Sequence, residues 1–415
     1  MPGRKGPIAS GSTRHTSFRD RTPNPPTITD RDQPRQAQPR RSFSCIVGHH
    51  GTAPWRKSQM HHRTRLHRGG AIGFFVAASM HATYASAASN NLGSCMAVPP
   101  AVVEIKGIDF YTDSKGSVAD PAAVAEFAKY KAPLEYFALQ LGAISDGEVD
   151  SKQTGGESCA TQWLTKWAQD GALTKPLKGG YALWLLSIVS AATSFAKVQS
   201  TNHSCDGNHV LITDWLHGLM NQVVSNENQG RPPGKENNLT HWAAYGAYVV
   251  GMLAGDKSLT DWAIGVYSRA LQNVTDDGFL PSELARGQMA LHYNLFSATP
   301  LMLVRLMAEN NGHREVAASD ERLKLFIRSS FAAMSDPSRL ERAVGTPIKS
   351  DNYAALNTVR LTLALYECRF GRLSVAPKME APKADWRLGT VFSFKSCPSG
   401  KLFPESIKSC RVSRH

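Results

Sequence analysis

Apolar residues recur every three or four positions through most of the chain between residues 121 and 370. The stretches 159–173, 209–224 and 258–272 each place their apolar side chains on one helical face, and 181–197 is apolar on nearly every side. Further helical stretches lie at 235–248, 283–309, 321–334 and 352–370. Alternating patterns typical of strands are almost absent. The pattern therefore predicts an all-α fold.

Short polar clusters separate these helices. The segments 202–209, 226–235, 275–278 and 310–313 are rich in Gly, Asn, Asp and Pro, which favour tight connections. Helices joined in this way form antiparallel hairpins, and several hairpins can pack either into an incomplete (α/α) toroid or barrel or into a bundle. In a toroid, loops and helix ends meet at one end, and we expect the functional residues there.

The ends of the chain differ from this helical part. Residues 1–59 are rich in Arg, Pro, Ser, Thr and Gln without an apolar period, which predicts a disordered basic extension upstream of a natural start at Met60. Residues 60–87 have the layout of a secretory signal peptide; the alternative is a poorly inserted internal helix. We expect a periplasmic or secreted domain at 88–394, without a stable membrane anchor, and an irregular basic tail at 395–415.

The positive charge of the chain belongs to its ends. Residues 1–70 hold 14 Lys and Arg against 3 Asp and Glu, whereas residues 71–376 hold 25 against 28. The predicted domain therefore has no net basic field that would attract phosphates, and a nucleic-acid partner is excluded as an inference from charge.

Six cysteines follow the predicted signal peptide. Export permits disulfides, but no CxxC unit and no zinc spacing is present, and we expect no metal site. Either a pair forms among the first three cysteines or some of the six are inert buried thiols. The six are Cys95, Cys159, Cys205, Cys368, Cys397 and Cys410.

The stretch 283–296 carries the first candidate chemistry. Arg286 and Tyr293 are seven residues apart, almost two helical turns, so both side chains would leave one face of a helix. A cation beside a phenol favours the phenolate, which makes Tyr293 a candidate proton acceptor near neutral pH. The alternative is that Tyr293 is a core residue of an amphipathic helix.

The stretch 235–248 carries a second set of residues with candidate chemistry. Asn237 and Asn238 follow a helix-breaking Pro-Pro-Gly segment and precede the apolar helix 242–253. Amide side chains and free backbone N–H groups at a helix start suit a carboxylate or a phosphate. The alternative is plain N-capping, a role that we also predict for Ser258 in the next helix.

These motifs, in this order, resemble those of the alginate lyases of the poly(β-D-mannuronate) lyase type. The likeness runs through NNLTHWAAYGAYVV, SLTDWAIGVY, DGFLPSELARGQMALHYN, DNYAAL and WRLGTVFS, and it covers most of residues 105–394. It implies an incomplete α/α toroid that cleaves an acidic polysaccharide by β-elimination, without metal or cofactor. We expect a monomer.

The resemblance also implies roles for three residues. Asn238 matches the asparagine that neutralises the substrate carboxylate, Arg286 the arginine that stabilises charge, and Tyr293 the base and acid. The base removes the proton on C5 of a uronate, and the acid protonates the departing 4-oxygen. One departure is that Leu239 stands where the family has histidine and His241 where tyrosine is usual.

Further substrate contacts are candidates on weaker grounds. Asn237, His241 and His292 are adjacent to the matched residues, and either histidine could instead be a core or surface residue. Trp242 either stacks on a sugar ring or belongs to the core. The last candidates are Arg387, which could reach a neighbouring uronate carboxylate, and the loop 109–120 with Tyr111 and Lys115, which is either a mobile lid or an ordinary surface turn.

Three functions follow from these observations. The first is a lyase acting on polymannuronate. The second is a broader polyuronate lyase that prefers polyglucuronate or hyaluronan-like chains, an alternative favoured by Leu239. The third is a uronate-binding protein that retains the fold without catalysis.

Overall fold

The computed structural model describes residues 95–151, 158–201, 205–231 and 233–389. All of them belong to one compact unit, which runs from Ala85 to His415. The predicted extension 1–59, signal peptide 60–87 and tail 395–415 lie outside the described residues.

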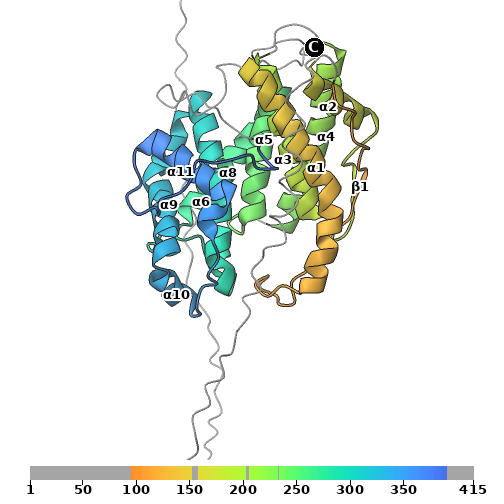
Figure 1. Ribbon diagram of the computed structural model, residues 1–415. Coiled ribbons are helices and arrows are strands. Elements are labelled where there is room, and N and C mark those ends of the chain that lie inside the picture. The colour runs from red at the N-terminus through yellow and green to blue at the C-terminus, as the bar shows by residue number, and fades with distance from the viewer. Residues whose placement is uncertain (1–94, 152–157, 202–204, 232, 390–415) are drawn as a thin grey trace, which may run out of the picture. The chain divides into compact units, whose positions relative to one another are not determined.

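Helices form nearly all of the regular structure in these described ranges (Figure 1), so the all-α prediction is confirmed. Two short strands, β1 (Glu104–Ile105) and β2 (Lys175–Pro176), pair in parallel. The helices are α1 (Pro121–Ser151), α2 (Cys159–Gln169), α3 (Tyr181–Thr201), α4 (Gly207–Gly230), α5 (Asn238–Ala254), α6 (Lys257–Gln272), α7 (Pro281–Leu284), α8 (Ala290–Asn310), α9 (Asp320–Ser335), α10 (Ser338–Val344) and α11 (Asn357–Phe370), with 3-10 turns η1 (Gly287–Met289), η2 (Arg314–Ser319) and η3 (Tyr353–Ala355).

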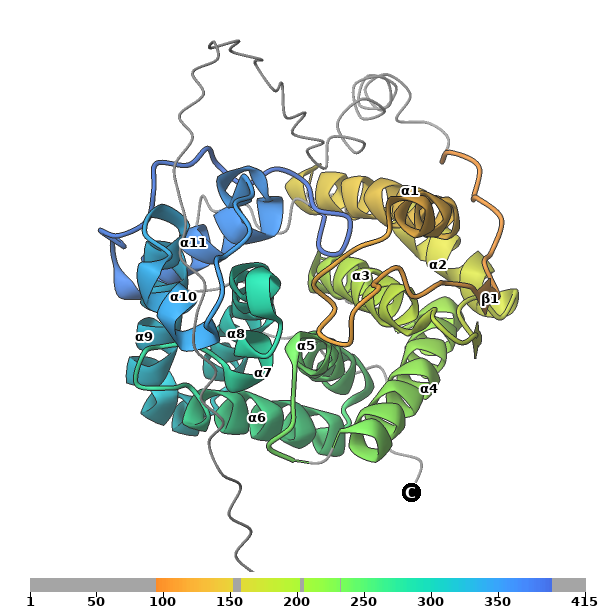
Figure 2. The same cartoon turned by 90° about the horizontal axis from the view of Figure 1, so that it is seen from below.

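Three helices form the inner layer of a ring. α3, α5 and α8 are buried along most of their length because they are apolar on almost every side. α1, α4, α6, α9 and α11 pack around them (Figure 2), and neighbours in the chain such as α5 and α6 are joined by short turns. This arrangement is the predicted α/α toroid.

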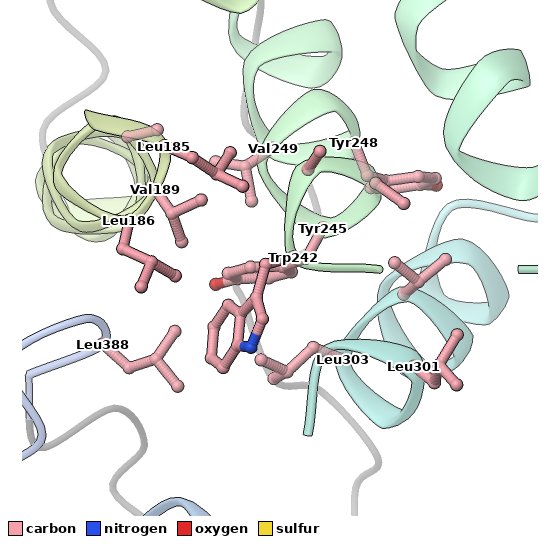
Figure 3. Close-up of a cluster of buried hydrophobic side chains, with 14 of the residues drawn as sticks. Leu185, Leu186, Val189, Trp242, Tyr245, Tyr248, Val249, Leu301, Leu303 and Leu388 are labelled. Carbon is pink, nitrogen blue, oxygen red and sulfur yellow. The ribbon is translucent and has the colours of Figure 1, made fainter. Parts of the chain in front are cut away.

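A cluster of buried side chains fills the space between the inner helices (Figure 3). Trp242 of α5 is fully buried and lies among Leu186 of α3, Leu303 of α8 and Leu388, which follows α11. The segment after α11 therefore contributes to the same core as the helices. α3 is also long and apolar enough to cross a membrane, but 89% of that stretch is buried inside the protein, as in a core helix.

Buried polar contacts join the starts of α3 and α5 to the end of α4. Glu227, 1% exposed, accepts hydrogen bonds from the Thr240 hydroxyl at 2.6 Å, from Arg231 Nη1 at 2.6 Å and from the Tyr181 hydroxyl. Because each carboxylate oxygen has a donor, this carboxylate can remain buried. The contacts fix the N-termini of α3 and α5 at the same end of the ring.

Two helix starts test the capping predictions. Asn237 is the N-cap of α5, and its side chain accepts from the backbone N–H of Leu239 and Thr240. The N-cap of α6 is Asp256, whose carboxylate accepts from the Ser258 backbone N–H. The prediction of Ser258 as N-cap was wrong because an acidic acceptor lies two residues earlier.

The segment 95–120 crosses the outside of the ring and carries Tyr111. A disulfide joins Cys95 to Cys159 at the start of α2, as one of the predicted pairings allowed. The indole N–H groups of Trp163 and Trp167, also on α2, donate to the carbonyls of Met96 and Pro99, both at 3.0 Å. The segment 95–120 is therefore anchored to α2 covalently and by hydrogen bonds.

Two further cysteines, Cys205 and Cys368, are each disulfide-bonded as well.

Replacing both Cys95 and Cys159 by serine should lower the free energy of unfolding by about 2–4 kcal/mol. The two cysteines are 64 residues apart, so the disulfide restricts a long loop of the unfolded chain. Urea denaturation of the variant and the wild type measures the difference. An unchanged midpoint would show that the segment is held by its other contacts alone.

His241 should make stability depend on pH. It is 1% exposed, and burial lowers its pKa from 6.5 to about 3, so the unfolded chain takes up a proton that the folded protein does not. Stability should therefore fall as the pH falls from 6.5 towards 3, by about 2 kcal/mol between pH 7 and pH 5. His241→Leu and His241→Gln should both remove this part of the loss, as measured by urea denaturation at the two pH values. A loss equal to that of the wild type in both variants would contradict the assignment.

Candidate active site

The Asn237–Asn238 pair marks the start of α5 at the end of the ring. Asn237 caps the helix, as the plainer alternative predicted. Asn238 is 2% exposed, and both its backbone N–H and its side-chain Nδ2 donate to Glu283, at 2.7 and 3.0 Å. An anion does bind at this helix start, and it is a carboxylate of the protein itself.

Glu283 is the site residue that the sequence did not reveal. It lies in α7, is 0% exposed, and receives a third hydrogen bond from the Ser282 hydroxyl at 3.2 Å. Burial raises the pKa of Glu283, whereas the donors of Asn238 and the charge of Arg286 oppose the rise. A glutamate beside a serine reads as a surface residue although Leu280 and Leu284 flank the pair, so only the tertiary contact with Asn238 identifies it.

Arg286 and Tyr293 are close together, but not through one continuous helix as predicted. α7 ends at Leu284, and η1 precedes α8, which begins at Ala290. Gly287 has a φ of +59°, a conformation that a regular helix does not contain. The Arg286 guanidinium carbon nevertheless lies 4.5 Å from the centroid of the Tyr293 ring, so the predicted contact forms through a turn.

The charge of Arg286 acts on the pKa of Tyr293 in the expected direction, but the expected net lowering of that pKa was wrong. The pKa of Tyr293 is raised, first by burial and then by Tyr111, and the Arg286 charge only reduces the rise. Tyr293 is 8% exposed, so the cost of placing a phenolate there exceeds the gain from the one neighbouring cation. The phenol is protonated at rest.

The loop 109–120 contacts both residues. The Tyr111 hydroxyl lies 2.5 Å from the Tyr293 hydroxyl, and Arg286 Nη1 donates to the Lys115 carbonyl at 3.1 Å. Gly116 has a φ of +63°, and a Cβ atom there would lie only 2.5 Å from Arg286 Nη1. The positive φ favours glycine at this position, and a side chain there would displace the end of Arg286.

An aspartate shapes the tip of this loop. Asp113 Oδ1 accepts from the backbone N–H of Ser117 at 2.7 Å and of Val118 at 2.8 Å. The Ser117 hydroxyl hydrogen bond and these backbone donors lower the pKa of Asp113 to about 2. The Ser117 carbonyl then accepts from Gln288 Nε2 of η1 at 3.0 Å. The loop is thus an ordered turn that rests on Arg286, Gln288 and Tyr293.

His292 and Arg387 lie beside Tyr293 at intermediate burial. The His292 ring centroid is 5.0 Å from that of Tyr293, and burial, followed by the charges of Arg387 and Lys349, lowers the pKa of His292 to about 4. Arg387 pairs with Asp385 at 3.0 Å, and its guanidinium carbon is 5.1 Å from the Phe296 ring centroid. His292 is therefore neutral near pH 7, and the Arg387 guanidinium is paired with the Asp385 carboxylate.

Two of the predicted substrate contacts are buried in the core, although the Trp242 ring centroid lies 5.7 Å from the guanidinium carbon of Arg387. His241 and Trp242 are 1% and 0% exposed, so in this conformation neither can touch a polysaccharide. For Trp242 the core alternative is the one that the structure shows (Figure 3). Leu239 is partly buried and packs against the core.

The structure thus brings most of the predicted residues together. Hydrogen bonds, ion pairs and ring contacts connect Asn238, Arg286 and Tyr293, and the loop and His292 border them. Amide and guanidinium donors can neutralise a carboxylate, and a phenol can transfer a proton. Within the described residues, no three His, Cys, Asp or Glu side chains gather in a way that could hold a metal ion.

Comparison with known proteins gives these features a context. The family model described as alginate lyase matches residues 157–340. An alginate lyase of Pseudomonas paraeruginosa is 30% identical over 315 residues, which cover 71% of this chain and 81% of that protein. A polysaccharide lyase of Stenotrophomonas maltophilia is 25% identical over 280 residues, covering 66% of this chain and 84% of that protein.

Solved structures support the same relationship at the level of the fold. Alginate lyase A1-III from Sphingomonas species A1 aligns with a TM-score of 0.55 at 20% identity, covering 71% of this chain and 84% of that one. A variant of A1-III complexed with a tetrasaccharide aligns with a TM-score of 0.57 at 20% identity, covering 71% and 83%. With the toroid shared and a relative at 30% identity covered over most of its length, this chain belongs to the alginate lyase family.

Proposed function

We propose that this protein is a polysaccharide lyase that cleaves 4-O-linked polyuronate by β-elimination, with polymannuronate as its preferred substrate. The observation that carries the proposal is the contact group of Asn238, Arg286 and Tyr293, in which carboxylate-binding donors lie beside a phenol. Membership of the alginate lyase family supports the substrate class.

The first task of such an enzyme is to neutralise the uronate carboxylate. Loss of the C5 proton adds negative charge next to that carboxylate, so donors must stabilise the enolate that develops. We assign this task to Asn238 and Arg286. Asn238 Nδ2 carries a second hydrogen, and for this hydrogen and for Arg286 Nη2 the described residues supply no acceptor. Arg286, whose side chain is 25% exposed, therefore has a donor left for substrate, whereas the amide of Asn238, 2% exposed, needs a local rearrangement to offer its second hydrogen.

The second task is proton transfer, which we assign to Tyr293. A phenol that is protonated at rest is suited to give its proton to the departing 4-oxygen. To remove the C5 proton, Tyr293 must first release its own proton to solvent; the phenolate then takes the C5 proton and passes it to the 4-oxygen, and Arg286 over the ring is the contact that favours this phenolate. The Tyr111 hydroxyl at 2.5 Å is a hydrogen-bond partner for either state of Tyr293.

Other residues around this group would bind neighbouring sugars. His292 contacts Tyr293, Arg387 lies near His292, and the Lys115 carbonyl accepts from Arg286, so the cationic side chains of Lys115 and Arg387 are candidates for further uronate carboxylates. A broader polyuronate preference remains the alternative, because Leu239 replaces the histidine of the family pattern. The Cys95–Cys159 disulfide supports a periplasmic or secreted location.

A substrate panel tests the proposed function. Incubation with polymannuronate, polyguluronate and polyglucuronate should give ultraviolet-absorbing unsaturated uronate ends, fastest with polymannuronate. Fastest cleavage of polyglucuronate would favour the broader lyase. If no polymer gave an absorbance change, catalysis would be excluded and a binding role would remain.

Tyr293→Phe should reduce turnover by at least about 10²-fold, because it removes the group that transfers protons. The change deletes one hydroxyl, whose only hydrogen bond within the described residues is with Tyr111, so the variant should stay folded and bind polymer. Tyr245→Phe is the matched control, since its buried hydroxyl contacts Thr193 in the core. A near-normal rate for Tyr293→Phe would remove this residue from the mechanism.

A further inference from the structure

Glu283 is a fully buried carboxylate in direct contact with two of the three proposed catalytic residues. Its Oε1 and Oε2 accept from the backbone N–H and Nδ2 of Asn238, and Oε2 lies 4.0 Å from Arg286 Nε. We propose that Glu283 is a positioning residue, which fixes the amide of Asn238 and the guanidinium of Arg286 in the orientation that binds the substrate carboxylate. This inference rests on the proposed function.

The chemistry of the contact explains why a carboxylate is needed. A side-chain amide has an accepting end and a donating end of nearly equal shape, and its neighbours decide which way it points. An ionised carboxylate only accepts, so it forces the Nδ2 end of Asn238 towards Glu283 and determines where the second hydrogen of Nδ2 points. If the amide were reversed, its Oδ1 would take the place of Nδ2, and an oxygen cannot donate to a uronate carboxylate.

The same carboxylate limits the movement of Arg286. Its guanidinium is held at Nε by the charge of Glu283, at Nη1 by the Lys115 carbonyl, and on its face by the Tyr293 ring. These three contacts leave Nη2 as the free donor among the described residues. Glu283 therefore acts on both groups through one oxygen, Oε2.

The arrangement has an electrostatic cost that makes it testable. The substrate is a polyanion, and a buried negative charge beside its binding groups opposes its binding. If Glu283 were retained only for packing, a neutral side chain of the same shape could take its place. A positioning role predicts that Glu283 raises kcat by fixing geometry while it also raises KM, and these two effects separate in kinetics.

Three variants test the inference by steady-state kinetics on the polyuronate that the wild type cleaves best. Glu283→Gln should lower kcat by about 10²-fold, as expected for a small misplacement of catalytic groups, and should lower KM because a negative charge is lost. Glu283→Asp retains the charge but withdraws the carboxylate by one methylene, so kcat should fall while KM stays near the wild-type value.

Glu227→Gln is the matched control. Glu227, near the end of α4, is also a buried glutamate that contacts the start of α5. Its donors are Tyr181, Arg231 and Thr240, none of which is proposed to be catalytic. This variant should lose thermal stability while the folded protein retains wild-type kcat and KM. Activities are expressed per folded protein, measured by circular dichroism.

Two results would overturn the inference. One is a kcat near the wild-type value for Glu283→Gln or for Glu283→Asp, of which the second decides the matter if Glu283→Gln does not fold. The other is a parallel loss in Glu283→Gln and Glu227→Gln that follows their loss of thermal stability, which would make Glu283 structural only. An inactive wild type would contradict the proposed function itself, whereas an active wild type with an active Glu283→Gln would contradict this inference alone.

Discussion

The active end of this ring depends on one buried interaction, the pair of hydrogen bonds from Asn238 to the carboxylate of Glu283. An unpaired carboxylate in this position would be strongly unfavourable, and three hydrogen bonds together with a nearby guanidinium compensate for its burial. The interaction joins the start of α5 to the short α7 that precedes α8. Two inner helices are thereby held in register at the point where the chemistry is proposed to occur.

The inner helices impose the wider constraint. α3, α5 and α8 are apolar on nearly every side, so they can be accommodated only where other helices surround them. At the helix starts, backbone N–H groups have no partner within the helix and, like the polar side chains there, need acceptors from elsewhere. Glu227 and Glu283 meet this need on two sides of the start of α5, and the catalytic candidates lie next to the second.

Much of this could be predicted from the sequence, because helical periodicity and helix-start residues are local signals. The all-α fold, the capped start of α5 and the proximity of Arg286 to Tyr293 belong to this class. The path between Arg286 and Tyr293 was not predicted, since a positive φ at Gly287 interrupts the expected helix. The N-cap of α6 was misplaced by two residues because Asp256 and Ser258 are both acceptors.

Burial was the property that local patterns could not supply. The pKa of Tyr293 has the opposite shift from the one expected, because the cost of desolvation outweighs the neighbouring cation. His241 and Trp242 are buried in the core, and Glu283 contacts Asn238 and Arg286 although nothing in its own sequence neighbourhood indicates this. Each of these depends on which helices pack together, which is decided by the whole ring.

The Cys95–Cys159 bond has a consequence for how the protein matures. In a reducing compartment, the segment that presents Tyr111 would be attached to α2 only through the indole hydrogen bonds and other weak contacts. Oxidation adds the covalent anchor after synthesis. Formation of this bond, which needs an oxidising environment, is therefore the step that completes the anchoring of the segment that presents Tyr111.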